Sequence, residues 1–236
     1  MTDAASPLSL QTGDQTDQPT VYERIRHDIL AGKLEANARL KISELAERFQ
    51  TSTNPVREAL QQLRGEGLVI FMPNQGARVR PIDMDFVRDV NEVGLQLEPY
   101  LLRWFVETVS PEDIEALEAI QSEIEELNFS DKPRHSRLNE RFHQLMYERH
   151  YNRVAYNLWK QHREILSAIS TRIPIAIGRR EAILSEHRKL IECIRAQDVE
   201  QAAKVLYHHI EDAGQHLVDQ LRIEEMRKRT SQSRIA

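Results

Sequence analysis

Residues 45–60 read Leu45-Ala46-Glu47-Arg48-Phe49-Gln50-Thr51-Ser52-Thr53-Asn54-Pro55-Val56-Arg57-Glu58-Ala59-Leu60. Apolar residues in and around this stretch recur at helical spacing in two groups, Leu40, Ile42, Leu45, Ala46 and Phe49, then Val56, Ala59, Leu60 and Leu63. The polar residues 51–54 between the groups carry side chains that can accept hydrogen bonds from the free N–H groups of a starting helix. Pro55 suits the first turn of that helix, where its missing N–H costs little. The pattern predicts a helix-turn-helix.

A β-hairpin is predicted directly after the second of these helices. Gly65-Glu66-Gly67 ends the helical pattern, and residues 68–71 form a short apolar string. Residues 73–76 have the composition of a turn, and residues 77–80 alternate with a two-residue period. A hairpin that follows a helix-turn-helix is a wing.

Composition excludes several protein classes. The chain has 236 residues and is 40% hydrophobic, enough for one large or two modest packed domains. Its single cysteine, Cys193, cannot form an internal disulfide. No apolar run approaches the roughly 20 residues of a membrane helix, and residues 1–20 do not resemble a secretory signal. We expect a cytoplasmic protein with no membrane partner.

The net charge of −5 is unevenly distributed. Residues 21–80 contain ten Lys and Arg against seven Asp and Glu, giving +3, whereas residues 81–236 contain 22 against 27, giving −5. The first twenty residues contribute −3. Positive charge is thus concentrated around the predicted helix-turn-helix, as phosphate contact by one domain requires.

The remaining sequence predicts an all-α bundle. We expect a disordered leader over residues 1–18, a winged helix over 19–80 that begins at a Thr20 cap, a linker over 81–83, a helical domain over 84–223 and a flexible basic tail over 224–236. Pro99 predicts a kink or a division within the first of the bundle helices, which are expected at 84–108, 111–128, 133–150, 152–172, 179–196 and 198–223.

Polar residues in the helical domain suggest a site inside the bundle. Asn139 and His143 are four residues apart and so lie on one helix face, while His187 and His209 belong to the two final helices. Side chains from three helices could converge in the interior. No short metal-ligand motif is present, so hydrogen-bonded or surface histidines are the alternative interpretation.

The N-terminal motifs resemble the winged helix of GntR-type transcriptional regulators. The resemblance rests on residues 52–60, Leu63, residues 66–69 and residues 76–79, which must occur in this order. Two positions depart from the family pattern. Ala36-Asn37 replaces a frequent Pro-Gly turn, which Asn can still form because it tolerates a left-handed backbone. Thr53 stands where many members have arginine.

The C-terminal motifs resemble the all-helical FCD domain of the FadR subgroup. They comprise residues 138–143, Glu186-His187 with Leu190 and Ile194, Asp198, Ala202 and His209-Ile210. The resemblance implies a divalent metal, most simply zinc, held by His143, His187, His209 and Asn139 beside an effector. Asn139 replaces the usual aspartate, which removes a negative charge, and Gly94 stands where arginine is frequent. A carboxylate effector would then supply both a ligand and the missing charge.

Together these features predict a mainly α, homodimeric, effector-responsive repressor. Its recognition helix would enter the major groove of double-stranded DNA at a near-palindromic operator, with contacts from Ser52, Thr53, Asn54, Arg57, Gly76 and Arg78. Two alternatives remain open at this point. One is a zinc-dependent hydrolase that uses the three histidines. The other is a protein that binds DNA nonspecifically or uses the winged helix for protein contact.

Overall fold

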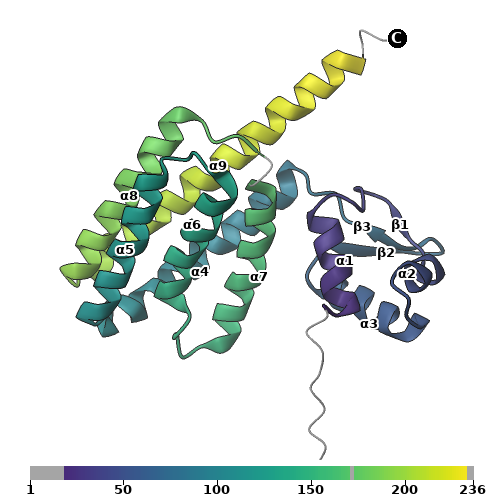
Figure 1. Ribbon diagram of the computed structural model, residues 1–236, viewed down its shortest axis with the longest axis horizontal. Helices are drawn as coiled ribbons and strands as arrows, with labels where there is room; N and C mark the ends of the chain where they lie inside the picture. The colour runs from purple at the N-terminus through teal and green to yellow at the C-terminus, as the bar shows by residue number, and fades with distance from the viewer. Residues whose placement is uncertain (1–18, 171–172, 233–236) are drawn as a thin grey trace, which may run out of the picture.

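The computed structural model describes residues 19–170 and 173–232 and consists of a winged helix beside a helical bundle (Figure 1). The winged helix contains α1 (Val21–Leu30), β1 (Arg39–Leu40), α2 (Ile42–Arg48), α3 (Thr53–Gly65), β2 (Val69–Met72) and β3 (Gly76–Val79). The bundle contains α4 (Met84–Thr108), α5 (Pro111–Leu127), α6 (Lys132–Tyr147), α7 (Arg153–Ser170), α8 (Ile177–Arg195) and α9 (Val199–Gln232). The predicted fold class is confirmed. The predicted leader, 1–18, lies outside the described residues.

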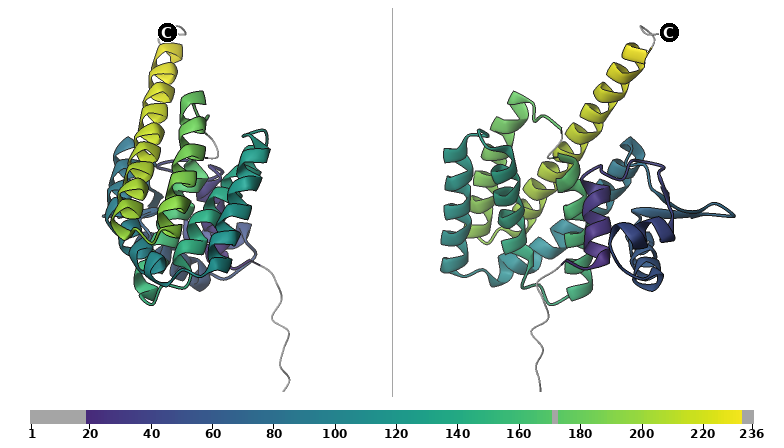
Figure 2. Two further views of the ribbon diagram at one scale, coloured as in Figure 1. Left: turned by 90° about the vertical axis from the view of Figure 1, so that its left-hand side faces the viewer. Right: turned by 45° about the vertical axis from the view of Figure 1, so that its right-hand side comes forward.

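Local sequence signals account for the winged helix. Thr20 and Glu23 form a capping box at the start of α1. Asn37 has φ 65°, so the expected left-handed turn before α2 is present. The sheet has the order β1-β3-β2, with Arg39 opposite Arg78 and Ile70 also opposite Arg78 in antiparallel register. The predicted wing is the β2–β3 hairpin, which extends away from the bundle (Figure 2).

Strand β1 was not predicted. We interpreted Leu40 as the first apolar residue of a helix, whereas its backbone pairs with Ala77 of β3 and its side chain is buried. A two-residue strand has no internal periodicity, and it exists only because the distant β3 offers it hydrogen bonds. The first helix of the helix-turn-helix therefore begins two residues later, at Ile42.

Apart from the C-terminal end of α9, the bundle helices begin and end within a few residues of the predicted positions. Ser110 and Asp113 form a capping box at α5, and Asp198 accepts a hydrogen bond from the Gln201 N–H at the start of α9. Helix α4 runs unbroken through Pro99, so the chain is not divided there. Its long apolar face packs along α9.

Helix α9 is longer than predicted and includes residues 224–232, which were expected to belong to a flexible basic tail. The helix continues to Gln232 and projects beyond the other helices in each view (Figures 1 and 2). Residues 215–232 contain no Gly or Pro and include several Gln, Arg, Glu and Leu residues, so helix propensity favours continuation of the helix. Residues 233–236 lie outside the described part of the chain.

Two hydrophobic cores hold the molecule together. One lies wholly within the bundle and includes Phe105, Phe142 and Tyr147. The other is built from the winged helix but continues into the bundle, where it includes Ile165, Ile169 and Ile173 beside α1 and the sheet. The winged helix is therefore packed against α7 through buried apolar side chains. Among the described residues, no helix combines the length and hydropathy needed to cross a lipid bilayer.

Candidate DNA-binding surface and effector cavity

Helix α3 has one buried and one exposed face. Val56, Ala59, Leu60 and Leu63 are at most 3% exposed and fix the helix against the winged-helix core. Arg57 lies on the opposite face and is exposed, as are residues 52–54 at the start of the helix. Ser52 is the N-cap residue, but its side chain makes no capping hydrogen bond. The polar N-terminal end of α3 is accordingly available to a ligand outside the protein.

The wing adds a smaller polar surface. Gly76 is exposed and has φ 76°, a left-handed conformation that glycine adopts readily. Arg78 is half-buried, and its guanidinium donates hydrogen bonds to the Asn37 carbonyl at 2.8 Å and to Oε1 of Gln75 at 3.2 Å. These hydrogen bonds hold the Arg78 side chain against the turn before α2, so Arg78 is less available than Arg57 for contact with an external ligand.

The three histidines from α6, α8 and α9 meet inside the bundle. His143, His187 and His209 are each at most 4% exposed, and each can place one ring nitrogen within 4.8 Å of the corresponding nitrogens of the other two. The ring centroids of His143 and His209 are 5.2 Å apart, and those of His187 and His209 are 4.9 Å apart. Among the described residues, no hydrogen-bond partner is present for Nε2 of His143 or for Nε2 of His187. Such orphaned, converging nitrogens are what a metal ion would satisfy.

Each histidine has a polar neighbour on its second ring nitrogen. Nδ1 of His187 is 2.8 Å from Oε1 of Gln121, and Nδ1 of His209 is 2.7 Å from Oε2 of Glu186. Nδ1 of His143 lies 3.5 Å from Oε2 of Glu98, which also accepts a hydrogen bond from the Tyr147 hydroxyl. Partners of this kind orient metal-binding imidazoles in proteins.

Electrostatics favour neutral imidazoles flanked by ionised carboxylates. Burial lowers the pKa of His143 to about 4 and the pKa of His187 well below its usual value, and the neighbouring positive charges act in the same direction. Burial also lowers the pKa of His209. Burial alone would raise the pKa of Glu98 and of Glu186, but the adjoining imidazoles and arginines hold both pKa values below normal. Neutral imidazole is the form that binds metal.

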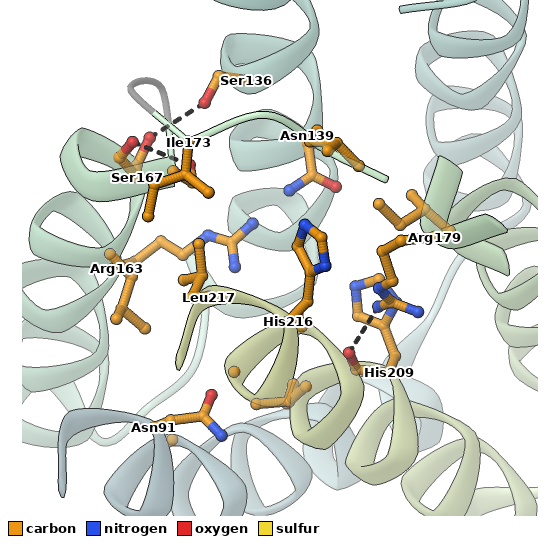
Figure 3. Close-up of a pocket in the computed structure, with 18 of the residues that line it drawn as sticks. Asn91, Ser136, Asn139, Arg163, Ser167, Ile173, Arg179, His209, His216 and Leu217 are labelled. Carbon is orange, nitrogen blue, oxygen red and sulfur yellow. Dashed lines mark hydrogen bonds between the residues drawn. The ribbon is translucent and has the colours of Figure 1, made fainter. Parts of the chain in front are cut away.

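A cavity of about 120 Å³ opens beside the histidines and reaches His209 (Figure 3). Asn139 and Gly94, the two positions at which the helical domain departs from the FCD pattern, both line it. Figure 3 shows the Asn139 amide and the His216 ring pointing into the same space as the guanidinium of Arg163. The described cavity lining therefore combines polar and charged residues, three of them cationic and one, Glu98, acidic, with the apolar side chains of Leu166, Ile175, Ile183, Ile210 and Leu217.

Several residues of this region were not singled out from the sequence. Glu186 could have been suspected from its position next to His187, but Gln121 and Arg163 belong to otherwise ordinary amphipathic helices. Arg179 donates hydrogen bonds to Glu186 at 2.7 Å and to the His209 carbonyl at 2.9 Å, a pairing across two helices that no local pattern indicates. His216 was weighed as a packing or cavity residue, and its Nε2 is 3.3 Å from the Pro174 carbonyl oxygen.

Two family descriptions match the chain, "Bacterial regulatory proteins, gntR family" over residues 18–79 and "FCD domain" over residues 89–212. HTH-type transcriptional regulator YdhC of Bacillus subtilis is 24% identical over 208 residues, which cover 85% of this chain and 93% of YdhC. HTH-type transcriptional repressor GlaR of Escherichia coli is 25% identical over 203 residues, which cover 80% of this chain and 90% of GlaR.

The solved structure of E. coli McbR/YncC has the same fold, with a TM-score of 0.66 at 20% identity, covering 85% of this chain and 96% of that one. The helix-turn-helix, the wing and the helical bundle thus occur in the same order in a known class of regulators that are not enzymes. This chain belongs to the GntR family of bacterial transcriptional regulators and carries an FCD domain.

Proposed function

We propose that this regulator is a homodimeric repressor, acting in the cytoplasm, that binds a near-palindromic operator with the N-terminal end of α3. The observation that carries the proposal is the exposed position of Arg57 on a helix whose other face is fully buried in the winged helix. A guanidinium in that position can contact guanine bidentately or clamp a phosphate. Ser52, Thr53, Asn54, Gly76 and Arg78 form the surrounding surface.

Arg57→Ala tests this assignment. The wild-type protein should select a discrete duplex sequence from a random library, and the variant should lose specific binding to that duplex while keeping its melting temperature, because Arg57 makes no buried contact. If Arg57 contacts a base, specificity at that base relaxes; if it contacts a phosphate, the salt dependence of binding falls by about one counterion. Arg103→Ala, a change at an exposed arginine of α4, is the control. Equal operator affinity for Arg57→Ala and wild type would contradict the assignment.

Two features support repression by a dimer. Two half-sites related by symmetry require two winged helices in fixed relation. GlaR, which is similar to this chain over most of its length, is named a repressor. In the simplest mechanism, effector binding shifts the population of arrangements in which both α3 helices match the half-site spacing.

We further propose that His143, His187 and His209, with the Asn139 amide, hold a divalent metal ion, zinc being the most suitable for an imidazole-rich site. The orphaned nitrogens and their polar neighbours fit such an ion. Bound metal would supply a positive centre for a carboxylate effector in the adjoining cavity. Because Asn139 is neutral, the protein ligands do not offset the positive charge of the divalent ion. A carboxylate effector should therefore bind the metal-loaded protein much more tightly than the metal-free protein.

Calorimetric titration of zinc into chelator-stripped protein tests the metal site. His187→Ala should abolish tight binding, whereas His208→Ala, which changes an exposed histidine of the same domain, should not. Asn139→Asp should tighten zinc binding, because the new carboxylate supplies a negative charge to the ion. The same change should reduce the amount by which a carboxylate effector increases zinc affinity. Unchanged zinc affinity in His187→Ala would remove the metal from the proposal.

A further inference from the structure

Arg163 differs from every other charged group around the cavity. Its guanidinium points into the cavity (Figure 3), and it makes no ion pair or hydrogen bond with any described residue, although its Nε atom is buried. Arg179, in the same cavity, forms an ion pair with Glu186 and donates a hydrogen bond to the His209 carbonyl, although its Nε atom has no hydrogen-bond partner among the described residues. Lys132 donates a hydrogen bond to the Ile173 carbonyl. Arg163 is half-buried, and Glu98, the acidic residue of the described cavity lining, already has His143 and Tyr147 as direct polar neighbours. A partly desolvated guanidinium without a direct partner is stabilised when an anion joins it, so Arg163 indicates a ligand with a negative group.

The size of the cavity limits that ligand. Its volume of about 120 Å³ is slightly smaller than the roughly 150 Å³ cavity that accommodates benzene in another protein. A ligand of about six non-hydrogen atoms therefore fits. The serine hydroxyls of Ser136, Ser167 and Ser170 and the Asn91 amide lie around the same space and can bond one further polar group. These properties describe a carboxylate of three or four carbons that carries a hydroxyl or oxo group.

Helix α7, which carries Arg163, also contacts the DNA-binding domain. Leu166, Ser167 and Ser170 line the cavity, while Ile165, Ile169 and Ile173, on or just beyond the same helix, are buried in the core shared with the winged helix. A displacement of α7 toward or away from a ligand must therefore change the packing under the winged helix, because close-packed interiors transmit small shifts.

An ion pair also connects α7 to the winged helix, in addition to the apolar contact. Glu164, the residue after Arg163, pairs with Nη1 of Arg26 on α1 at 2.8 Å. Nε of the same arginine is 2.9 Å from Oε2 of Glu66, the residue that caps the C-terminal end of α3, and Glu66 also accepts a hydrogen bond from the Tyr22 hydroxyl. Arg26 thus joins the cavity helix to the end of the recognition helix with a side chain that is only 14% exposed.

We propose that Arg163 anchors the carboxylate of a short-chain hydroxy or oxo acid, and that α7 conveys its binding to α3 through the Glu164–Arg26–Glu66 link. The proposal rests on the proposed function and deepens it by naming the ligand class, the anchoring residue and the route to the DNA-binding helix. Arg163 acts here as a binding residue, and Glu164 acts only by holding Arg26 in position.

Ligand binding is tested by calorimetry on zinc-loaded protein with L-lactate, pyruvate and 3-hydroxybutyrate, and with lactamide as a neutral analogue. At least one of the three acids should bind the wild type, and lactamide should not. Arg163→Met should weaken that acid about 10- to 100-fold while leaving zinc binding and the circular dichroism spectrum intact. Arg103→Met serves as the control. Absence of binding by all three acids, or equal affinity in Arg163→Met, overturns the assignment of Arg163.

Coupling is tested with Glu164→Gln and the operator duplex selected by the wild type. Glu164→Gln should bind the acid with wild-type affinity, but the acid should change operator affinity at least about fivefold less than it does for the wild type. Glu200→Gln, which removes the partner of Arg103 at a remote surface pair, should respond like the wild type. A full response in Glu164→Gln overturns the route. If no duplex is selected at all, the proposed function fails, whereas calorimetry still decides the role of Arg163.

Discussion

Gly214 is the position at which α9 packs closely against the Asn91 side chain of α4. A Cβ atom at this position would lie 2.1 Å from Nδ2 of Asn91, far inside van der Waals contact. Asn91 and Gly214 both line the cavity, so the missing side chain leaves room for a polar group at the cavity wall. Only glycine allows this arrangement without moving Asn91.

Gly214→Ala is therefore expected to destabilise the protein by about 1–3 kcal/mol, although Gly→Ala within a helix ordinarily stabilises by up to about 1 kcal/mol. Gly178→Ala in α8 is the matched control, because a Cβ atom there meets nothing within 4 Å. Chemical denaturation measures both. In an Asn91→Ala background the penalty at Gly214 should disappear; a penalty that persists there would show that Asn91 is not its cause.

The charges around the histidines give the cavity its chemistry. Glu98 and Glu186 stand behind His143 and His209, and the pKa of each carboxyl is held below normal. Arg179 offsets Glu186 through their ion pair, which leaves Arg163 facing the cavity without a partner among the described residues. Glu98 lies in the same lining, but the described lining also contains Lys132, Arg163 and the paired Arg179. This excess of positive charge favours an anionic ligand before any metal is considered.

At the scale of the element, two N-cap serines have different roles. Ser110 accepts a hydrogen bond from the Asp113 N–H at 3.2 Å and belongs to the capping box of α5. Ser52 occupies the N-cap of α3 without such a bond, and it is exposed at the proposed DNA-binding surface. A serine precedes both helices in the sequence, but only Ser110 uses its hydroxyl to cap the helix.

Ser110→Ala should lower the free energy of unfolding by about 1 kcal/mol, because the first turn of α5 loses its cap. Ser52→Ala should change it by less than about 0.5 kcal/mol and should instead weaken operator binding. Thermal denaturation and operator titration of the two variants distinguish these outcomes. Equal destabilisation by both substitutions would mean that Ser52 caps α3 in solution.

At the scale of the whole molecule, the winged helix and the bundle share one core. Ile165, Ile169 and Leu217 of the bundle are buried together with winged-helix residues such as Ile25 and Val79. Such a continuous contact makes the orientation of α3 depend on the state of α7 and α9. Regulation can then act through orientation while the recognition surface itself stays unchanged.

A dimer that presents two winged helices should bind a duplex with both half-sites at least about 100-fold more tightly than a duplex with one. Changing the spacing between half-sites by five base pairs, about half a helical turn, should reduce affinity to the one-site value. Fluorescence anisotropy with the three duplexes provides the comparison. Equal affinity for all of them would indicate a protein that binds as a monomer.

The sequence by itself determined the class of protein and most of the elements. Hydrophobic periodicity, capping residues and the Asn37 turn act over a few neighbouring residues, so the helices, the wing and the family resemblance could be predicted from them. The positions of the three histidines on separate helices already suggested one site inside the bundle, and the resemblance added the expectation that the site holds a metal ion. Local signals failed at β1, where pairing with a distant strand decided the outcome. At the end of α9 the prediction of a tail was wrong although the local composition favours a helix, which continues to Gln232.

Only the tertiary structure decided which side chains face one another. Nothing near Gln121, Glu98 or Arg163 in the sequence marks them, because each occupies an ordinary position of an amphipathic helix. Their significance arises from the packing of α4, α5 and α7 around the histidines, which places Gln121 and Glu98 behind imidazoles and leaves Arg163 facing the cavity. Contacts between helices far apart in the chain depend on the summed packing of the whole bundle, which no local pattern records.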